Sequence, residues 1–105
     1  MFVVIFRAKP KTQDETYSKT VARMRTLAFE KYGCLDFVAA TEAGSEGEQE
    51  VAISYWENEV AIRKWKQDSE HLLAQETGRA NWYESYTVQV LELKREYSYS
   101  VNESD

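Results

Sequence analysis

The sequence predicts an α+β fold of the ferredoxin-like type, in the order βαββ, a helical segment and a last strand. Three observations predict it. Residues 2–8, FVVIFRA, are β-branched and aromatic, which is typical of a strand. Apolar residues at 17, 21, 24 and 28 recur at three- and four-residue steps, which is typical of an amphipathic helix. Residues 81–97 have an extended pattern, so a further strand follows the helices.

The first helix has a predicted beginning and end. Pro10 closes the first strand, and Thr12 followed three residues later by Glu15 is the capping-box pattern of a helix start. The apolar stripe continues to about Tyr32. Gly33 then ends the helix in the left-handed conformation that glycine adopts without strain.

Two strands and a loop are predicted after this helix. Residues 34–41 and 51–56 alternate apolar and polar side chains, as half-buried strands do. Between them, the segment 42–50, EAGSEGEQE, is glycine-rich and acidic, which predicts a solvated hairpin loop.

The helical segment that follows is predicted as two short helices. Asn58 caps the first, which carries Trp65, and either Asp68 or Ser69 caps the second. Gly78 ends the second helix.

The last strand is predicted to span residues 81–97. Apolar residues at 86, 88 and 90 share one face and those at 91 and 93 share the other, so a β-bulge is expected near Val90. We expect residues 1–97 to form one domain and residues 98–105 to form a flexible tail.

A single sheet of this kind leaves one face and its last strand uncovered, and both are liabilities in a monomer. Two copies that pack their sheets face to face would cover the apolar face, and exchange of the last strand would cover the edge. The sequence therefore predicts a homodimer, in the form of a dimeric α+β barrel.

Composition excludes several partners. The net charge of −5 disfavours nucleic acid, which needs a basic surface, and there is no apolar run long enough to span a membrane. Cys34 is the only cysteine, so no internal disulfide is possible, and we expect a cytoplasmic protein. The sequence contains none of the metal-ligand or nucleotide motifs CxxC, HExxH, GxGxxG or P-loop, so neither a metal nor a nucleotide cofactor is expected.

The chain resembles the antibiotic-biosynthesis-monooxygenase family over residues 2–97. The matching motifs are Ser54-Tyr55-Trp56, Glu59-x-Ala61 with Trp65, His71-x-x-Ala74-Gln75-x-x-Gly78-Arg79, Tyr83-x-x-Tyr86-x-Val88-x-Val90 and Arg95-x-Tyr97. The resemblance implies a dimeric α+β barrel. Its members include oxygenases of phenolic polyketides that use no cofactor, quinol oxygenases and haem-degrading enzymes.

Haem degradation is disfavoured within that family. Haem-degrading members carry an asparagine on the first strand and a haem-ligating histidine ten residues after a tryptophan that matches Trp65. Here the first strand has no asparagine, the position ten residues on is Gln75, and the only histidine, His71, lies four residues before it.

Five residues are candidates for the site. His71 titrates near neutral pH, so it is the candidate base, or a histidine that caps a turn. Arg79 is the candidate for stabilising an anion, or it forms an ion pair or bonds the last helix carbonyls. Trp65 is a stacking surface and N–H donor for an aromatic ligand, or a core residue. Tyr86 and Arg7 are candidate substrate-binding residues, and Arg7 alternatively faces solvent.

Other aromatic residues and the cysteine are expected to be structural. Tyr83 and Tyr86 are three apart on a strand, so at most one of them is expected to line the cavity. Trp56 and Trp82 are expected in the core or an interface, and Cys34 as a small buried residue.

These features support three hypotheses. The first is a monooxygenase that uses O2 on a phenolic, quinol or polycyclic aromatic molecule without a cofactor. The second is a dimer that binds haem or another hydrophobic small molecule. The third is a structural or regulatory dimer with a filled interior.

Overall fold

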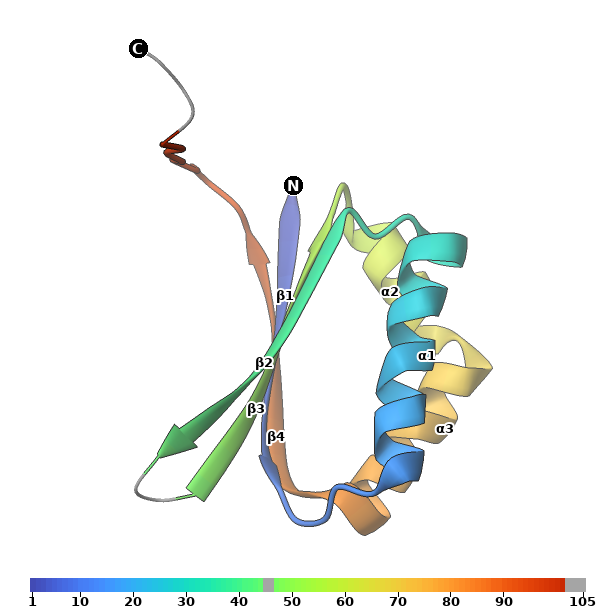
Figure 1. Ribbon diagram of the computed structural model, residues 1–105. Helices are drawn as coiled ribbons and strands as arrows, with labels where there is room; N and C mark the ends of the chain where they lie inside the picture. The colour runs from blue at the N-terminus through green and yellow to red at the C-terminus, as the bar shows by residue number, and fades with distance from the viewer. Residues whose placement is uncertain (45–46, 102–105) are drawn as a thin grey trace.

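The computed structural model describes residues 1–44 and 47–101, and its elements follow the predicted α+β order. They are β1 (Phe2–Pro10), α1 (Glu15–Tyr32), β2 (Asp36–Gly44), β3 (Gly47–Trp56), α2 (Glu59–Gln67), α3 (Ser69–Thr77), the π-helical turn η1 (Gly78–Trp82) and β4 (Tyr83–Glu92). The antiparallel sheet has the order β2-β3-β1-β4, and the helices cover one of its faces (Figure 1). The ferredoxin-like prediction is therefore confirmed. Among the described residues, no helix is long and apolar enough to cross a membrane.

Helix α1 begins two residues later than the capping box predicts. Asp14 is the N-cap, and its carboxylate accepts a hydrogen bond from the Tyr17 N–H at 2.8 Å. The Thr12 prediction is wrong because the Thr12 N–H instead donates to the Trp82 carbonyl at 3.3 Å, which ties this loop to η1. At the other end, Gly33 ends the helix with a φ of 74°, as predicted.

The hairpin between β2 and β3 is longer than predicted. Most of the segment expected as a loop, 42–50, belongs to the strands, which pair as far as Gly44 opposite Gly47. Main-chain ladder bonds form whatever the charge of the exposed side chains, so the acidic composition did not end the strands. Residues 45 and 46 of the predicted loop lie outside the described residues.

The predicted β-bulge near Val90 is wrong. Strand β4 pairs with β1 without interruption around that position, and the register shifts instead at Lys9 and Pro10. Pro10 lies opposite Tyr83 while Lys9 lies opposite Ser85, so the additional residue on β4 is Glu84.

Strand β4 also ends earlier than predicted, at Glu92 rather than near Tyr97. Its partner β1 starts at Phe2, which lies opposite Glu92, so the ladder has no further partner strand on that side. Beyond it, the Leu93 N–H still donates to the Met1 carbonyl at 2.9 Å. The following segment leaves the sheet, and Tyr97 is 86% exposed (Figure 1). Of the predicted tail, residues 102–105 lie outside the described residues.

Helix α3 ends at Thr77 with Gly78 as its C-cap, as predicted. Gly78 keeps a right-handed φ of −59°, and the chain continues into η1. A Cβ atom on Gly78 would lie 2.9 Å from Cε2 of Tyr83. Position 78 therefore requires glycine because the Tyr83 ring approaches it closely.

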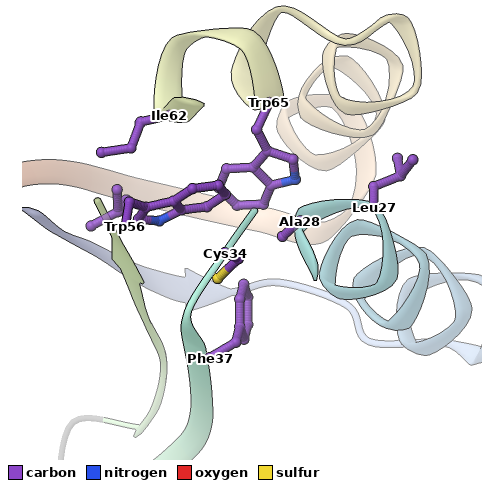
Figure 2. Packing of buried hydrophobic residues seen from close by; sticks show 8 residues of the cluster. Leu27, Ala28, Cys34, Phe37, Trp56, Ile62 and Trp65 are labelled. Atoms are coloured by element: carbon purple, nitrogen blue, oxygen red, sulfur yellow. The ribbon is translucent and has the colours of Figure 1, made fainter. Parts of the chain in front are cut away.

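The core lies between the helices and the sheet (Figure 2). Trp56 is fully buried, its ring lies 5.1 Å from that of Trp65, and its indole N–H donates to Ser54 Oγ at 2.8 Å. Trp82 is buried as expected, and so is Cys34, where burial raises the pKa of the thiol. This core makes α2 a fixed support for the residues that follow it.

Candidate functional site

A cavity of about 150 Å³ lies between the helix layer and the covered face of the sheet. Its lining is mostly apolar, with contributions from Val4, Phe6, Val21, Met24 and Val88. Several lining side chains are only half-buried, so a small molecule can reach the interior from solvent. Among the polar lining residues we distinguish two groups, the cationic end (Lys66, His71 and Gln75) and the tyrosine end (Tyr17, Tyr83, Tyr86 and Glu50), and Thr20 of α1 also lines the cavity.

At the cationic end, His71 packs edge-on against Trp65 with their ring centroids 4.5 Å apart. Its Nδ1 atom is buried and has no hydrogen-bond partner among the described residues. Burial, and then the positive charge of Lys66, lower the pKa of His71 from 6.5 to about 4. The imidazole is therefore neutral at pH 7, and its unpartnered nitrogen is a candidate contact for a ligand.

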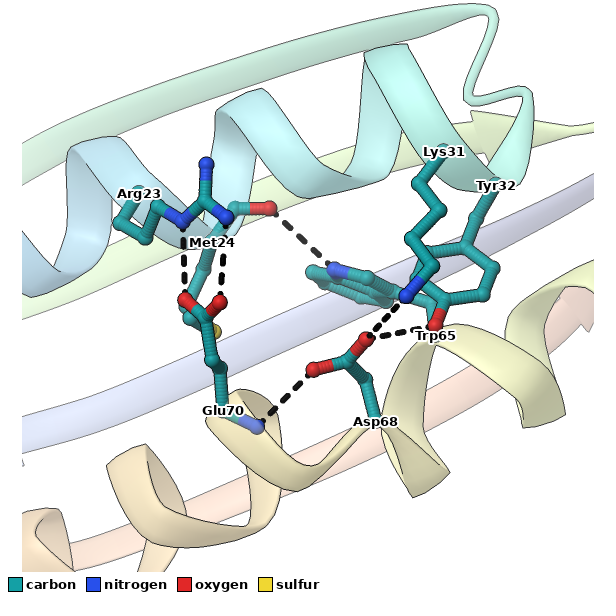
Figure 3. A network of polar contacts seen from close by, with 7 residues as sticks. All are labelled: Arg23, Met24, Lys31, Tyr32, Trp65, Asp68 and Glu70. Carbon is teal, nitrogen blue, oxygen red and sulfur yellow. Dashed lines mark hydrogen bonds and ion pairs between the residues drawn. The ribbon is translucent and has the colours of Figure 1, made fainter.

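Polar contacts tie α1 to the start of α3, just before His71 in the sequence (Figure 3). Asp68 caps α3 by accepting from the Glu70 N–H at 2.9 Å, as the sequence predicts, and it also accepts from the Tyr32 hydroxyl at 2.6 Å. That second bond is the main cause of the lowered pKa of Asp68. Arg23 of α1 donates to both oxygens of Glu70, at 2.8 and 3.0 Å. Asp68 and Glu70, which precede His71, are thus both bonded to side chains of α1.

Trp65 is both a core residue and part of the cavity lining. Its indole N–H donates to the Met24 carbonyl of α1 at 3.2 Å (Figure 3). The N–H group is therefore already used within the protein, so the predicted donation to a ligand is wrong. The ring itself remains available as one wall of the cavity.

The tyrosine end is built from aromatic contacts between β1, α1 and β4. The Phe6 ring lies 5.4 Å from that of Tyr83 and 5.6 Å from that of Tyr86. The Tyr83 ring also lies 5.8 Å from that of Tyr17. Burial, followed by the neighbouring Tyr17 hydroxyl, raises the pKa of Tyr83 well above its usual value. Both Tyr83 and Tyr86 line the cavity because the bulge at Glu84 returns them to the same face, so the prediction that at most one does is wrong.

Glu50 places a carboxylate in the tyrosine end. It accepts hydrogen bonds from Thr41 Oγ1 and from Gln13 Nε2, each at 2.8 Å. Glu50 lies in β3 opposite Ala8, where its side chain points to the covered face. The predicted hairpin loop would have placed this residue in solvent.

The structure brings together three of the five predicted site residues. His71, Trp65 and Tyr86 line one cavity, and Arg79 lies at its margin, where it donates to the Tyr86 hydroxyl at 3.0 Å. Arg7 lies on the opposite face of the sheet and donates to Gln49 at 3.0 Å, so its predicted place in the cavity is wrong. Strand alternation explains this position, since Val4 and Phe6 of the same strand face the cavity.

The lining also includes residues that sequence reasoning missed: Lys66, Gln75, Tyr17, Tyr83 and Glu50. Two signals were present. Tyr17 belongs to the apolar stripe of α1, and alternation back from Ala52 places Glu50 on the same face. Neither signal reveals that these side chains meet.

The cavity does not suit a metal ion or haem. Among residues 1–44 and 47–101, no three His, Cys, Asp or Glu side chains are grouped to hold a metal. A cavity near 150 Å³ in another protein holds benzene, and the porphyrin of haem is several times larger, so haem does not fit.

Comparison with known proteins gives relatives in both sequence and structure, although no family model matches the chain. It is 36% identical over 104 residues to the uncharacterized protein YqjZ of Bacillus subtilis, covering 99% of this chain and 89% of YqjZ. It is 28% identical over 91 residues to jasmonate monooxygenase ABM of Pyricularia oryzae, covering 86% of this chain and 42% of that protein.

Solved structures share the fold at low identity. SnoaB, a cofactor-independent oxygenase from Streptomyces nogalater, superposes with a TM-score of 0.73 at 14% identity over 97% of both chains. Rv0793 from Mycobacterium tuberculosis gives a TM-score of 0.70 at 17% identity, over 92% of this chain and 98% of its own. At 36% identity over nearly its whole length, the chain belongs to the same family as YqjZ, and it shares its fold with solved oxygenases of the antibiotic biosynthesis monooxygenase type.

Proposed function

We propose that this protein is a monooxygenase that oxidises a small phenol, quinol or similar electron-rich aromatic compound with O2 and without a bound cofactor. The observation that carries the proposal is the apolar cavity, in which a histidine lies beside a tryptophan wall and has a ring nitrogen without a partner in the described part of the chain. The description of SnoaB as cofactor-independent supports the same chemistry.

The reaction balances with O2 as the only co-reactant. The substrate hydroxyl loses its proton, and the resulting phenolate passes an electron to O2. Combination of the two radicals forms a carbon–oxygen bond, and the hydroperoxide then loses water to leave a carbonyl. The substrate supplies all four electrons, one oxygen atom enters the product and the other leaves as water. The protein contributes orientation and a water-poor cavity.

The cavity residues have distinct roles in this proposal. His71 accepts or relays the substrate proton, and Trp65 is the wall on which the ring stacks. Tyr86 contacts the substrate, and Arg79 is a positioning residue because it reaches the cavity only through the Tyr86 hydroxyl.

An imidazole with a pKa of about 4 is a weak base for a phenol of pKa near 10. Burial is the main cause of that low value, and it disfavours the charged imidazolium. A phenolate beside the ring would supply a negative charge next to the imidazolium and so stabilise it. Proton transfer in this site therefore depends on stabilisation of the phenolate by the cavity.

We also propose that the active form is a homodimer. Apolar residues lie on the face of the sheet opposite the helices, among them Ile5, Ile53, Val38 and Leu91, and the last two are 51% and 43% exposed. A second copy would bury this face. Sedimentation velocity should give a dimer for the native chain and a smaller species for Val38→Glu; a native monomer would contradict the proposal.

Oxygen consumption tests the enzyme hypothesis. A screen of hydroquinones and hydroxynaphthalenes should find a substrate whose turnover falls at least tenfold in His71→Ala and markedly in Trp65→Phe. Glu76→Gln is the matched control, because it is exposed on α3 outside the cavity lining. Equal turnover in all four proteins would remove the site assignment.

Binding of a hydrophobic small molecule without turnover is the second candidate function, and the apolar lining favours it. It would show saturable binding of aromatic compounds with no oxygen uptake. The cavity itself argues against the third hypothesis, a dimer whose aromatic residues fill the interior.

A further inference from the structure

The two ends of the cavity carry different charged groups. Lys66 lines the cationic end, and it makes no ion pair within the described part of the chain. His71 lies close enough for the Lys66 charge to act on it, and its Nδ1 has no partner among the described residues. Lys66 and an imidazole nitrogen that has no partner among the described residues thus line one apolar space.

The ends are separated along the strands. Tyr86 of the tyrosine end lies opposite Ala8 of β1. At the cationic end, Trp65 packs against Phe37, which is in register with Val4 through β3. Val4 and Ala8 are four residues apart on one strand, which corresponds to about 13 Å.

The tyrosine end has hydrogen-bonding groups and charges of both signs. The Tyr86 hydroxyl accepts from Arg79 at 3.0 Å, so its own proton is available to a ligand oxygen. Glu50 adds a carboxylate to the same end, and Arg79 adds a guanidinium group. An uncharged carbonyl can accept a hydrogen bond there, whereas an anionic group would also be repelled by the Glu50 carboxylate.

We propose that Lys66 and His71 together bind the ionised hydroxyl oxygen of an aromatic ligand, while the tyrosine end admits only the uncharged end of that ligand. This inference deepens the proposed function and rests on ligand binding in the same cavity. Lys66 is then the residue that favours ionisation of the ligand hydroxyl at the cationic end. The ligand class is a planar aromatic with one acidic hydroxyl and a neutral acceptor at its far end.

Electrostatics explains why Lys66 matters. A positive charge in a partly desolvated site interacts more strongly with an anion than it would in water. It therefore favours phenolate over phenol, while burial and the same charge keep His71 neutral. The ligand anion in turn gives the unpaired ammonium group a partner.

The probe for this proposal is 7-hydroxycoumarin, which is planar, has one acidic hydroxyl and a carbonyl at the other end, and absorbs differently as phenol and phenolate. Its ionisation is measured by absorbance, free and with excess protein, across a pH series. We expect the bound probe to ionise at lower pH than the free probe. Lys66→Met should weaken phenolate binding at least tenfold, whereas Lys66→Arg should retain most of it.

Lys64→Met is the matched control, because Lys64 is an exposed lysine of the same helix outside this cavity. It should leave the ionisation of the probe unchanged. Equal ionisation in Lys66→Met and Lys64→Met would overturn the inference. It would leave the oxygenase proposal intact, since oxygen uptake is measured separately.

A second probe tests the tyrosine end. The 3-carboxylate of 7-hydroxycoumarin places a negative charge next to the carbonyl, so it should bind several-fold more weakly than the parent compound. Glu50→Gln should recover much of that difference. Equal affinity of the two probes for the native protein, or failure of the parent probe to bind, would contradict the assignment.

Discussion

Stability should fall as the pH drops from about 6.5 to 4, because His71 is held neutral in the folded protein. Its pKa is 6.5 in an unfolded chain and about 4 in the fold, so the unfolded state binds a proton first. The free energy of unfolding is therefore highest above pH 6.5 and decreases as the pH falls towards 4. Each pKa unit corresponds to about 1.4 kcal/mol, so the full loss is about 3 kcal/mol, and about 2 kcal/mol after allowance for partial exposure.

The assay is urea denaturation at a fixed protein concentration, followed by far-UV circular dichroism at several pH values. A loss of about 2 kcal/mol should lower the urea midpoint by about 1 M. His71→Gln should remove most of this dependence, since glutamine does not titrate. The lowered carboxyl pKa values of Asp68 and Glu70 act mainly below pH 4.5 and are present in both proteins. Parallel pH profiles for the native chain and His71→Gln would refute the burial of a neutral imidazole.

Three further substitutions test the local structure by the same denaturation assay. Ser54→Ala should cost about 1 to 3 kcal/mol, because it leaves a buried indole N–H without the acceptor it has at 2.8 Å. Gly78→Ala should cost about 1 to 3 kcal/mol, since the new Cβ would lie 2.9 Å from the Tyr83 ring, and it should also weaken binding of 7-hydroxycoumarin in a titration. Asp14→Ala should cost about 1 kcal/mol and Thr12→Ala much less; equal losses would contradict the observed N-cap.

Local signals in the sequence were sufficient for most of the fold. Gly33 and Asn58 act within a few residues of their own positions, so a left-handed C-cap and an Asx N-cap follow from the sequence alone. The motif Ser54-Tyr55-Trp56 also has a local explanation. Its first and third residues share one face of β3 and bond to each other.

The candidate site was less predictable, because it depends on strand register. A spacing of three residues places Tyr83 and Tyr86 on opposite faces of a regular strand. The extra residue at Glu84 reverses that outcome, and the bulge arises where β4 meets Pro10, more than seventy positions earlier in the sequence. No pattern within β4 itself reveals this pairing.

The sequence by itself determined the order of helices and strands, the ferredoxin-like class and the choice of His71 and Trp65 as site candidates. These follow from periodicity, capping and residue chemistry, which act over short distances along the chain. Tertiary structure alone decided that Arg7 faces away, that the Trp65 N–H is already bonded, and that Lys66 and Glu50 lie in one cavity with opposite charges. The reason is physical: a side chain's surroundings depend on which strands pair in which register and on how the helices pack over them.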